Sequence, residues 1–135
     1  MATISNIAYE QANGKVIVTY CHYDGYPENN GRLIDKHYNN KAKAKELANV
    51  GYLSGLKSTI AESIENRVHQ DKPVVYDNIK QYLNDVNWHI EWIYLFKNNQ
   101  WYVCEGQSSF APEPAIENDL QPLWSVLARL EQVSA

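Results

Sequence analysis

Alternating apolar and polar positions near the N-terminus predict a β-hairpin. Apolar residues alternate on either side of Asn13-Gly14, and β-branched side chains are frequent directly after it. Asn-Gly is a strong hairpin signal because both residues accept the positive φ angles of a two-residue turn. We therefore expect strands over residues 3–10 and 15–23.

The clearest alternation in the chain lies between residues 88 and 97, where large aromatic and aliphatic side chains occupy every second position. Asn98-Asn99 follows, and both asparagines tolerate positive φ. Apolar side chains return on one face over 100–105. This pattern predicts a second hairpin, with strands over 88–97 and 100–105.

Between the two hairpins, apolar residues recur at helical spacing. The spacing predicts helices within residues 29–50 and over 58–68. Asn39-Asn40 interrupts the first of these stretches, so a second short helix is expected over 41–49.

The remaining segments of this middle region give weaker patterns. Residues 51–57 are typical of a turn, 74–76 could form a brief strand, and 79–86 could form one or two helical turns. Taken with the two hairpins, these elements predict an α+β fold, in which helices pack on an antiparallel sheet.

The C-terminal part of the chain separates into a linker and an amphipathic helix. We expect a single α+β domain over 1–106, a linker over 107–116 with two prolines and no period, and a helix within 117–135. Pro122 suits the first turn of that helix. Its apolar stripe, at helical spacing, consists of Leu120, Leu123, Trp124, Leu127, Leu130 and Val133.

This stripe has two possible partners. It can pack on the domain's own sheet, or it can cross to a second subunit, because the linker would give it the necessary reach. A pocket shared between subunits is a common way for a small protein to enclose a ligand. We therefore expect a homo-oligomer with the helix over 118–133 at or near the interface.

Composition excludes several classes of protein. The chain has 135 residues, long enough for a core of its own, and a net charge of −4 without a cluster of Lys and Arg, which argues against binding to duplex nucleic acid. No signal-peptide pattern and no membrane-spanning apolar segment is present, so we expect a cytoplasmic protein with no membrane partner. Cys21 and Cys104 lack a metal-ligand spacing, which favours two buried thiols and no metal or other cofactor.

The densest run of chemically capable side chains is residues 20–27, where the second strand gives way to a turn and then to a helix. On an extended backbone Tyr20, His22 and Asp24 would point to one face, with Cys21 on the other. Gly25 permits positive φ, and Pro27 stiffens the turn. The pattern predicts a small polar site at this strand end.

The helix that follows could complete such a site. Backbone N–H groups around Asn29, Asn30 and Gly31 would offer an anion site, with Arg32 as a planar donor for phosphate. Tyrosine rings could stack on a base. The predicted ligand-binding residues are Tyr20, His22, Tyr23, Asp24, Tyr26, Asn30, Arg32 and His37.

Simpler structural roles are also open for these residues. Asp24 can serve only as a turn or capping residue, and His22 can hydrogen-bond a buried carbonyl. His37 lies at a helical apolar position, which is typical of a half-buried histidine. His69 is expected in solvent, and His89 could pair with Glu91 two positions further on.

Residues 20–27 read Tyr-Cys-His-Tyr-Asp-Gly-Tyr-Pro, and a Gly, a His-Tyr pair and the stretch 51–56 follow. This series resembles a family of small, mostly uncharacterised bacteriophage proteins, whose signature is Tyr-Cys-His-Trp-Asp-Gly-Tyr-Pro followed by Gly and Leu, His-Tyr, and Gly-Asp-Ile-Ser-x-Leu. The resemblance covers roughly residues 15–57. The chain departs from it at Tyr23, where the family usually has Trp, and at Tyr52, where the family usually has an acidic residue.

The resemblance implies a phage gene product that acts in the host bacterial cytoplasm. Small phage proteins of this kind often oppose host defence, for example by sequestering a cyclic nucleotide or an ADP-ribose-derived signal. The first hypothesis is therefore an anti-defence protein that binds such a signal without cleaving it. The alternatives are an inhibitor that docks on a host protein, and a hydrolase that uses His22 with Asp24 as its orienting carboxylate. No catalytic residue is assigned, because the chain has no recognisable nucleophile pattern.

Overall fold

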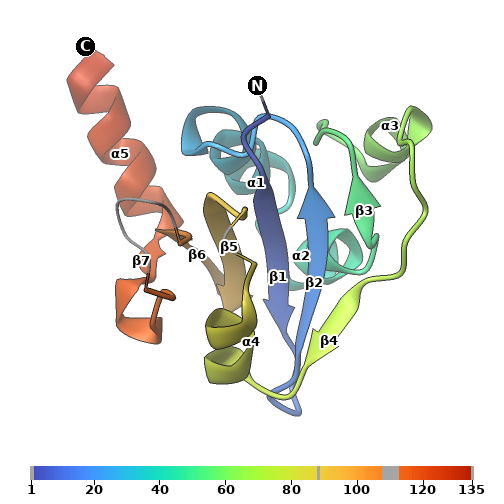
Figure 1. Cartoon of the computed structure of the whole chain (residues 1–135). Coiled ribbons are helices and arrows are strands. Elements are labelled where there is room, and N and C mark those ends of the chain that lie inside the picture. The colour runs from blue at the N-terminus through green and yellow to red at the C-terminus, as the bar shows by residue number, and fades with distance from the viewer. Residues whose placement is uncertain (1, 88, 108–112, 135) are drawn as a thin grey trace.

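A mixed sheet of seven strands forms the centre of the molecule, in the computed structural model that describes residues 2–87, 89–107 and 113–134 (Figure 1). The order along the sheet is β3-β2-β1-β5-β6-β7, and β4 also pairs with β2. The strands are β1 (Ser5–Glu10), β2 (Val16–Cys21), β3 (Tyr52–Leu53), β4 (Val74–Tyr76), β5 (Trp92–Lys97), β6 (Gln100–Glu105) and β7 (Gln121–Pro122).

The helices are short except for the last one. They are α1 (Arg32–His37), α2 (Lys41–Ala48), α3 (Ile60–Glu65), α4 (Ile79–Asp85) and α5 (Leu123–Ser134). A five-residue π-helix, Pro27–Gly31, leads into α1, and a 3-10 turn, Glu117–Asp119, precedes β7. The structure therefore confirms the α+β class.

Both predicted hairpins are confirmed. β1 pairs antiparallel with β2, and β5 pairs antiparallel with β6. Their turns use the expected left-handed residues, with φ of 86° at Gly14 and 50° and 65° at Asn98 and Asn99. The second hairpin begins later than predicted, because β5 starts at Trp92; residue 88 lies outside the described residues.

The prediction of a purely antiparallel sheet is wrong. β1 pairs parallel with β5, and β2 pairs parallel with β3. Parallel neighbours need a long crossover connection, and the chain supplies one in each case. Helices α1 and α2 lie between β2 and β3 in the sequence, and α1 to α4 lie between β1 and β5. Local alternation cannot show this, because it reports which face a residue takes and not which strand lies beside it.

Two apolar clusters pack on the two faces of the sheet. The first lies between the sheet and α1, α2 and α5, with Ile34, Leu47 and Leu123 buried in it. The second lies on the opposite face under α4, with Tyr82 and Leu83 buried in it. Figure 1 shows α1 and α2 behind the sheet and α4 in front of its lower half. One face is thus covered by three helices, and the other mainly by one.

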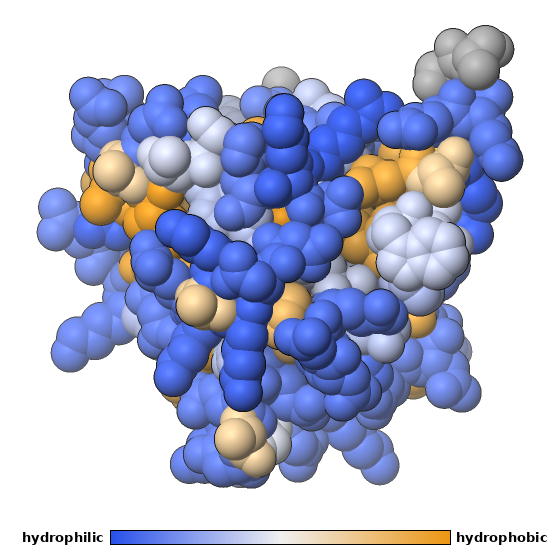
Figure 2. Space-filling view, turned by 180° about the vertical axis from the view of Figure 1, so that it is seen from behind, coloured by the Kyte–Doolittle hydropathy of each residue, from blue (hydrophilic) through white to orange (hydrophobic). Residues whose placement is uncertain are grey.

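The C-terminal helix packs on the chain's own sheet. Leu123 and Leu127 are buried in the first cluster, whereas Trp124 on the same helix is 63% exposed. Pro122 belongs to β7 instead of the first helical turn, so the helix starts five residues later than predicted, at Leu123. Seen from behind, polar residues cover most of the surface, and apolar atoms show in two places, toward the α5 side and at the opposite side of the molecule (Figure 2).

The predicted helix over 58–68 is real but shorter, at Ile60–Glu65, where Thr59 caps it. The predicted linker lies partly outside the described residues, which omit 108–112; residues 113–116 carry no helix or strand. Within the described ranges, no helix is long and apolar enough to cross a membrane.

Candidate functional site

The face of the sheet that α4 covers only in part carries an aromatic cleft over β2. Tyr20 on β2 and Tyr52 on β3 are directly opposite one another in the parallel pair. Neighbouring positions on adjacent strands share a face, so their rings stack, with centroids 5.5 Å apart and planes 18° apart. Tyr20 lies on the same face as Val16 and Val18, whereas Cys21 faces the helices behind.

This tyrosine pair is the middle of a longer row of rings. On one side the His22 ring lies 6.0 Å from Tyr20, and Tyr23 meets His22 edge-on at 4.6 Å. On the other side His69 meets Tyr52 edge-on at 5.0 Å. The row offers both ring faces and ring nitrogens at a surface, and Tyr23 is 51% exposed at its end.

A hydrogen bond fixes the relative position of the two central polar groups. The Tyr20 hydroxyl and His22 Nδ1 are 2.9 Å apart. Burial raises the pKa of Tyr20, and the neighbouring Tyr52 and Cys21 raise it further. The hydroxyl therefore stays protonated at neutral pH and can donate to Nδ1 when the ring proton of His22 is on Nε2.

Gly51 sets the depth of the cleft. Its φ is +98°, and a Cβ atom there would lie 1.8 Å from the Asp71 carbonyl oxygen, so only glycine lets the segment 69–73 cross so close to β2 and β3. The buried Thr19 hydroxyl holds Gly51 from below: it accepts the Gly51 N–H at 2.9 Å and donates to the Ala48 carbonyl at 2.7 Å.

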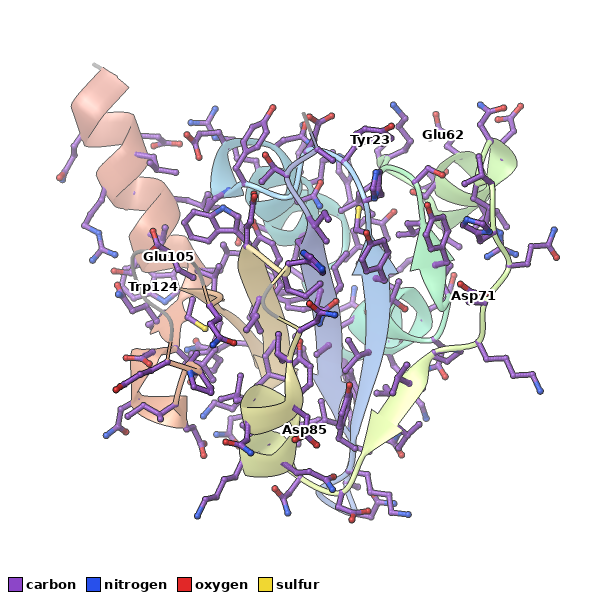
Figure 3. The ribbon with its side chains drawn as sticks, in the orientation of Figure 1. Tyr23, Glu62, Asp71, Asp85, Glu105 and Trp124 are labelled. Atoms are coloured by element: carbon purple, nitrogen blue, oxygen red, sulfur yellow. The ribbon has the colours of Figure 1, made fainter. Side chains whose placement is uncertain are left out.

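The outer part of the cleft is a cavity of about 490 Å³. The aromatic row, the glycine and the crossing segment form its walls: Tyr20, His22, Gly51, Tyr52, His69, Asp71, Lys72 and Val74. Among the described residues that line it, Lys72 is the one Lys or Arg, and Asp71 lies beside it. Figure 3 shows Asp71 on the segment that runs past β3, at the right-hand border of this face.

A second cavity of about 430 Å³ continues the cleft toward α4, and Tyr20, Gly51 and Val74 belong to both. Its other lining residues come from β1 and the residue before it, β2, β4, the end of α4 and the chain between α4 and β5: Ile4, Asn6, Val18, Tyr76, Asp85, Val86, Asn87, His89 and Ile90. Figure 3 shows Asp85 at the lower end of the same face. We call the two parts the outer and inner chambers.

The structure brings only part of the predicted site together. Tyr20 and His22 line the outer chamber, and Tyr23 contacts His22. Asp24 and Tyr26 are exposed and are not among the lining residues; the Tyr26 hydroxyl donates to Asp24 Oδ1 at 3.4 Å. The expected alternation breaks because β2 ends at Cys21 and Asp24 has a φ of 58°.

The glycine next to Asp24 has a different role from the one expected. Gly25 has no positive φ; it is needed because a Cβ there would lie 2.7 Å from Ser5 Cβ. The left-handed residue of this turn is Asp24 itself, and Asp is one of the few residue types that accept that conformation.

The expected anion site is occupied by the protein's own hydrogen bonds. The N–H groups of Asn29 and Asn30 both donate to the Tyr26 carbonyl, because the chain turns into a π-helix here. The Asn30 side chain is fully buried and donates to Ser5 Oγ at 3.1 Å and to Cys21 Sγ at 3.5 Å. Asn30 therefore supports the strand end from behind and does not reach the cleft.

Arg32 and His37 lie at the two ends of α1, Arg32 exposed and His37 half-buried. The buried side of α1 belongs to the cluster behind the sheet, whereas Tyr20 packs with the cluster in front. Neither residue is among those lining the two chambers. The sheet thus stands between α1 and the cleft.

Tyr52, His69 and Lys72 are the residues that sequence reasoning missed. They join Tyr20 only through the parallel pairing of β2 with β3 and the crossing of residues 69–73 over Gly51. Gly51 itself was the available signal, since a glycine just ahead of a short apolar pair can mark a close approach of another segment.

Within the described ranges, no group of three or more His, Cys, Asp or Glu side chains is placed to hold a metal ion. Cys21 and Cys104 are free and buried, and burial raises the pKa of both thiols. No protein-family model matches the chain, and comparisons with curated proteins and with solved structures gave no match.

Proposed function

We propose that this protein binds a small anionic, nucleotide-derived signal in the aromatic cleft and sequesters it without cleaving it. The observation that carries the proposal is the row of rings from Tyr23 to His69, with Lys72 at its rim. Aromatic rings bind bases by stacking, which any base can do and which does not depend on the net charge of the protein. An acidic protein can therefore still bind a nucleotide here.

The charges around the outer chamber suit a phosphate. Lys72 offers an ammonium group on a flexible stem, and the ring nitrogens of His22 and His69 are additional donors on the same cavity wall. These groups provide a place for a phosphate in the outer chamber, and the tyrosines, with Tyr20 shared between the two chambers, provide a place for a base in the same cleft.

Binding without cleavage fits the arrangement of the reactive groups. The proposed His22–Asp24 dyad of a hydrolase is not formed, because His22 Nδ1 bonds the Tyr20 hydroxyl and the Asp24 carboxylate bonds the Tyr26 hydroxyl. Burial raises the pKa of the Cys21 thiol, which keeps it protonated and unreactive. The likeness of residues 20–27 to a phage signature supplies the biological context: a phage protein that removes a defence signal from the host cytoplasm.

Titration calorimetry with a panel of cyclic nucleotides and ADP-ribose isomers tests the proposal. We expect at least one member to bind, and Lys72→Gln to weaken it by about 1.5–3 kcal/mol, the range for hydrogen bonds to charged groups. Arg32→Gln is the matched control, because it removes one exposed cation from α1 behind the sheet. A loss with Arg32→Gln and none with Lys72→Gln would move the ligand away from the cleft.

A further inference from the structure

We propose that the inner chamber is a base-binding subsite that recognises adenine through the Asn6 side chain. The inference rests on the proposed function, since it assigns the base of the ligand to the inner chamber and its phosphate to the outer one. It adds a ligand class and a specificity residue to the site.

The two chambers are parts of one cleft. Tyr20 forms a wall of both, and Gly51 and Val74 lie at their junction. A nucleotide can therefore extend across both chambers, with its sugar at the junction and its base and phosphate in different chambers. The inner chamber, at about 430 Å³, is large enough for a base.

The walls of the inner chamber suit the faces of a base. Val18 and Tyr20 on β2 and Tyr76 on β4 lie around it, with further apolar side chains from Ile4, Val86 and Ile90. The charge on its rim favours a base over a phosphate: Asp85 lines it, and neither Lys nor Arg is among the described residues that do. A carboxylate repels phosphate and accepts hydrogen bonds from an amino group.

Asn6 provides the specific polar group. It lies on β1 directly opposite Tyr20, so its side chain shares the face of the cleft. The residue is 9% exposed and lines the chamber, so its amide has little access to solvent. An asparagine amide donates and accepts at once, and adenine matches it with two hydrogen bonds: its N6 amino group donates to Oδ1, and its N7 atom accepts from Nδ2.

A buried hydroxyl beneath Asn6 is also short of a partner. Tyr82 is fully buried, and its hydroxyl has no hydrogen bond of good geometry among the described residues. Burial raises the pKa of Tyr82 strongly, and the nearby Asn6 side chain lowers it. Buried polar groups without partners are rare, and a small rotation of the Asn6 amide toward Tyr82 would satisfy this one.

Three ligands that differ in one feature each test the inference: AMP, purine riboside 5′-monophosphate, which lacks the amino group, and ribose 5-phosphate, which lacks the base. For the wild-type protein we expect AMP to bind about 10-fold more tightly than the purine analogue, within the range for one bidentate base contact. Ribose 5-phosphate should bind more weakly still. Equal affinity for AMP and the purine analogue would overturn the inference.

Asn6→Leu supplies the second arm, because leucine fills a similar volume without hydrogen-bonding atoms. It should abolish the difference between AMP and the purine analogue and leave the affinity for ribose 5-phosphate unchanged, which also shows that the variant is folded. Lys72→Gln should instead weaken all three ligands by a similar factor. If none of the three binds although a member of the cyclic nucleotide panel does, the inference fails and the proposed function stands; if no panel member binds either, both fail. If they bind without discrimination by the base, only the inference fails.

Discussion

Replacing Thr19 by valine should destabilise the protein and deform the cleft. The Thr19 hydroxyl is buried between α2 and Gly51, where it donates to the Ala48 carbonyl at 2.7 Å and accepts the Gly51 N–H at 2.9 Å. Valine has nearly the same shape and an equal preference for strands, so the substitution removes the hydroxyl and little else.

The expected size follows from the two backbone groups that lose their partner. A buried donor or acceptor left without a hydrogen bond costs about 1–3 kcal/mol. The extra apolar surface of valine offsets part of this loss, at about 0.8 kcal/mol per buried carbon. We therefore expect Thr19→Val to lower the free energy of unfolding by about 2–4 kcal/mol, measured by urea titration followed by circular dichroism.

Thr19→Ser is the matched control, because it keeps the hydroxyl and loses one methyl group, at a cost of about 1 kcal/mol. The account requires the valine variant to be less stable than the serine variant. If Thr19→Val were within 0.5 kcal/mol of wild type, or more stable than Thr19→Ser, the hydroxyl would not hold Gly51 as described.

Two further predictions concern pH and assembly. Burial raises the pKa of Cys104 to about 12 from 9.0, so above pH 9 the folded state keeps a proton that the unfolded state loses. The free energy of unfolding therefore falls as the pH rises from about 9 toward 12. Urea titrations should show that Cys104→Ala loses less stability than wild type between pH 9 and pH 11. We also expect a homo-oligomer whose interface includes the exposed Trp124. Light scattering at micromolar concentration should report more than one subunit for wild type and a smaller species for Trp124→Ala. A monomeric wild type would contradict this prediction.

Local sequence patterns predicted the elements that depend on near neighbours. Asn13-Gly14 and Asn98-Asn99 predicted both hairpins, and the break at Asn39-Asn40 separates two real helices, the second of which Asn40 caps. These features succeed because turn and cap preferences are set within a few residues.

Features that depend on distant segments were missed. The parallel β2–β3 pair joins residues 20–21 to 52–53, and no local period distinguishes a two-residue strand from a turn. The same pairing brings Tyr52 onto Tyr20 and, with Gly51, brings His69 into the cleft. Tyr20 and His22 could be predicted because they lie on a strand end, whereas their partners come from a different part of the chain.

The account of Asp24 and Arg32 failed for a related reason. It assumed that the strand continued past Cys21 and that a regular helix began near Asn29, so that both side chains would meet one pocket. A left-handed residue at Asp24 and a π-helix at Pro27–Gly31 redirect the chain instead. Such local irregularities have little sequence signal beyond the presence of tolerant residue types.

Recovery of the ligand from the protein is the most direct test of binding without cleavage. The pure protein is incubated with the panel member that it binds best, separated from free ligand, denatured by heat, and the released material is identified by mass spectrometry. The account predicts the intact compound in a fixed ratio to protein chains, with a reduced yield from Lys72→Gln and a normal yield from Arg32→Gln. Accumulation of a cleaved product in excess of protein, or no retained ligand for any panel member, would contradict it.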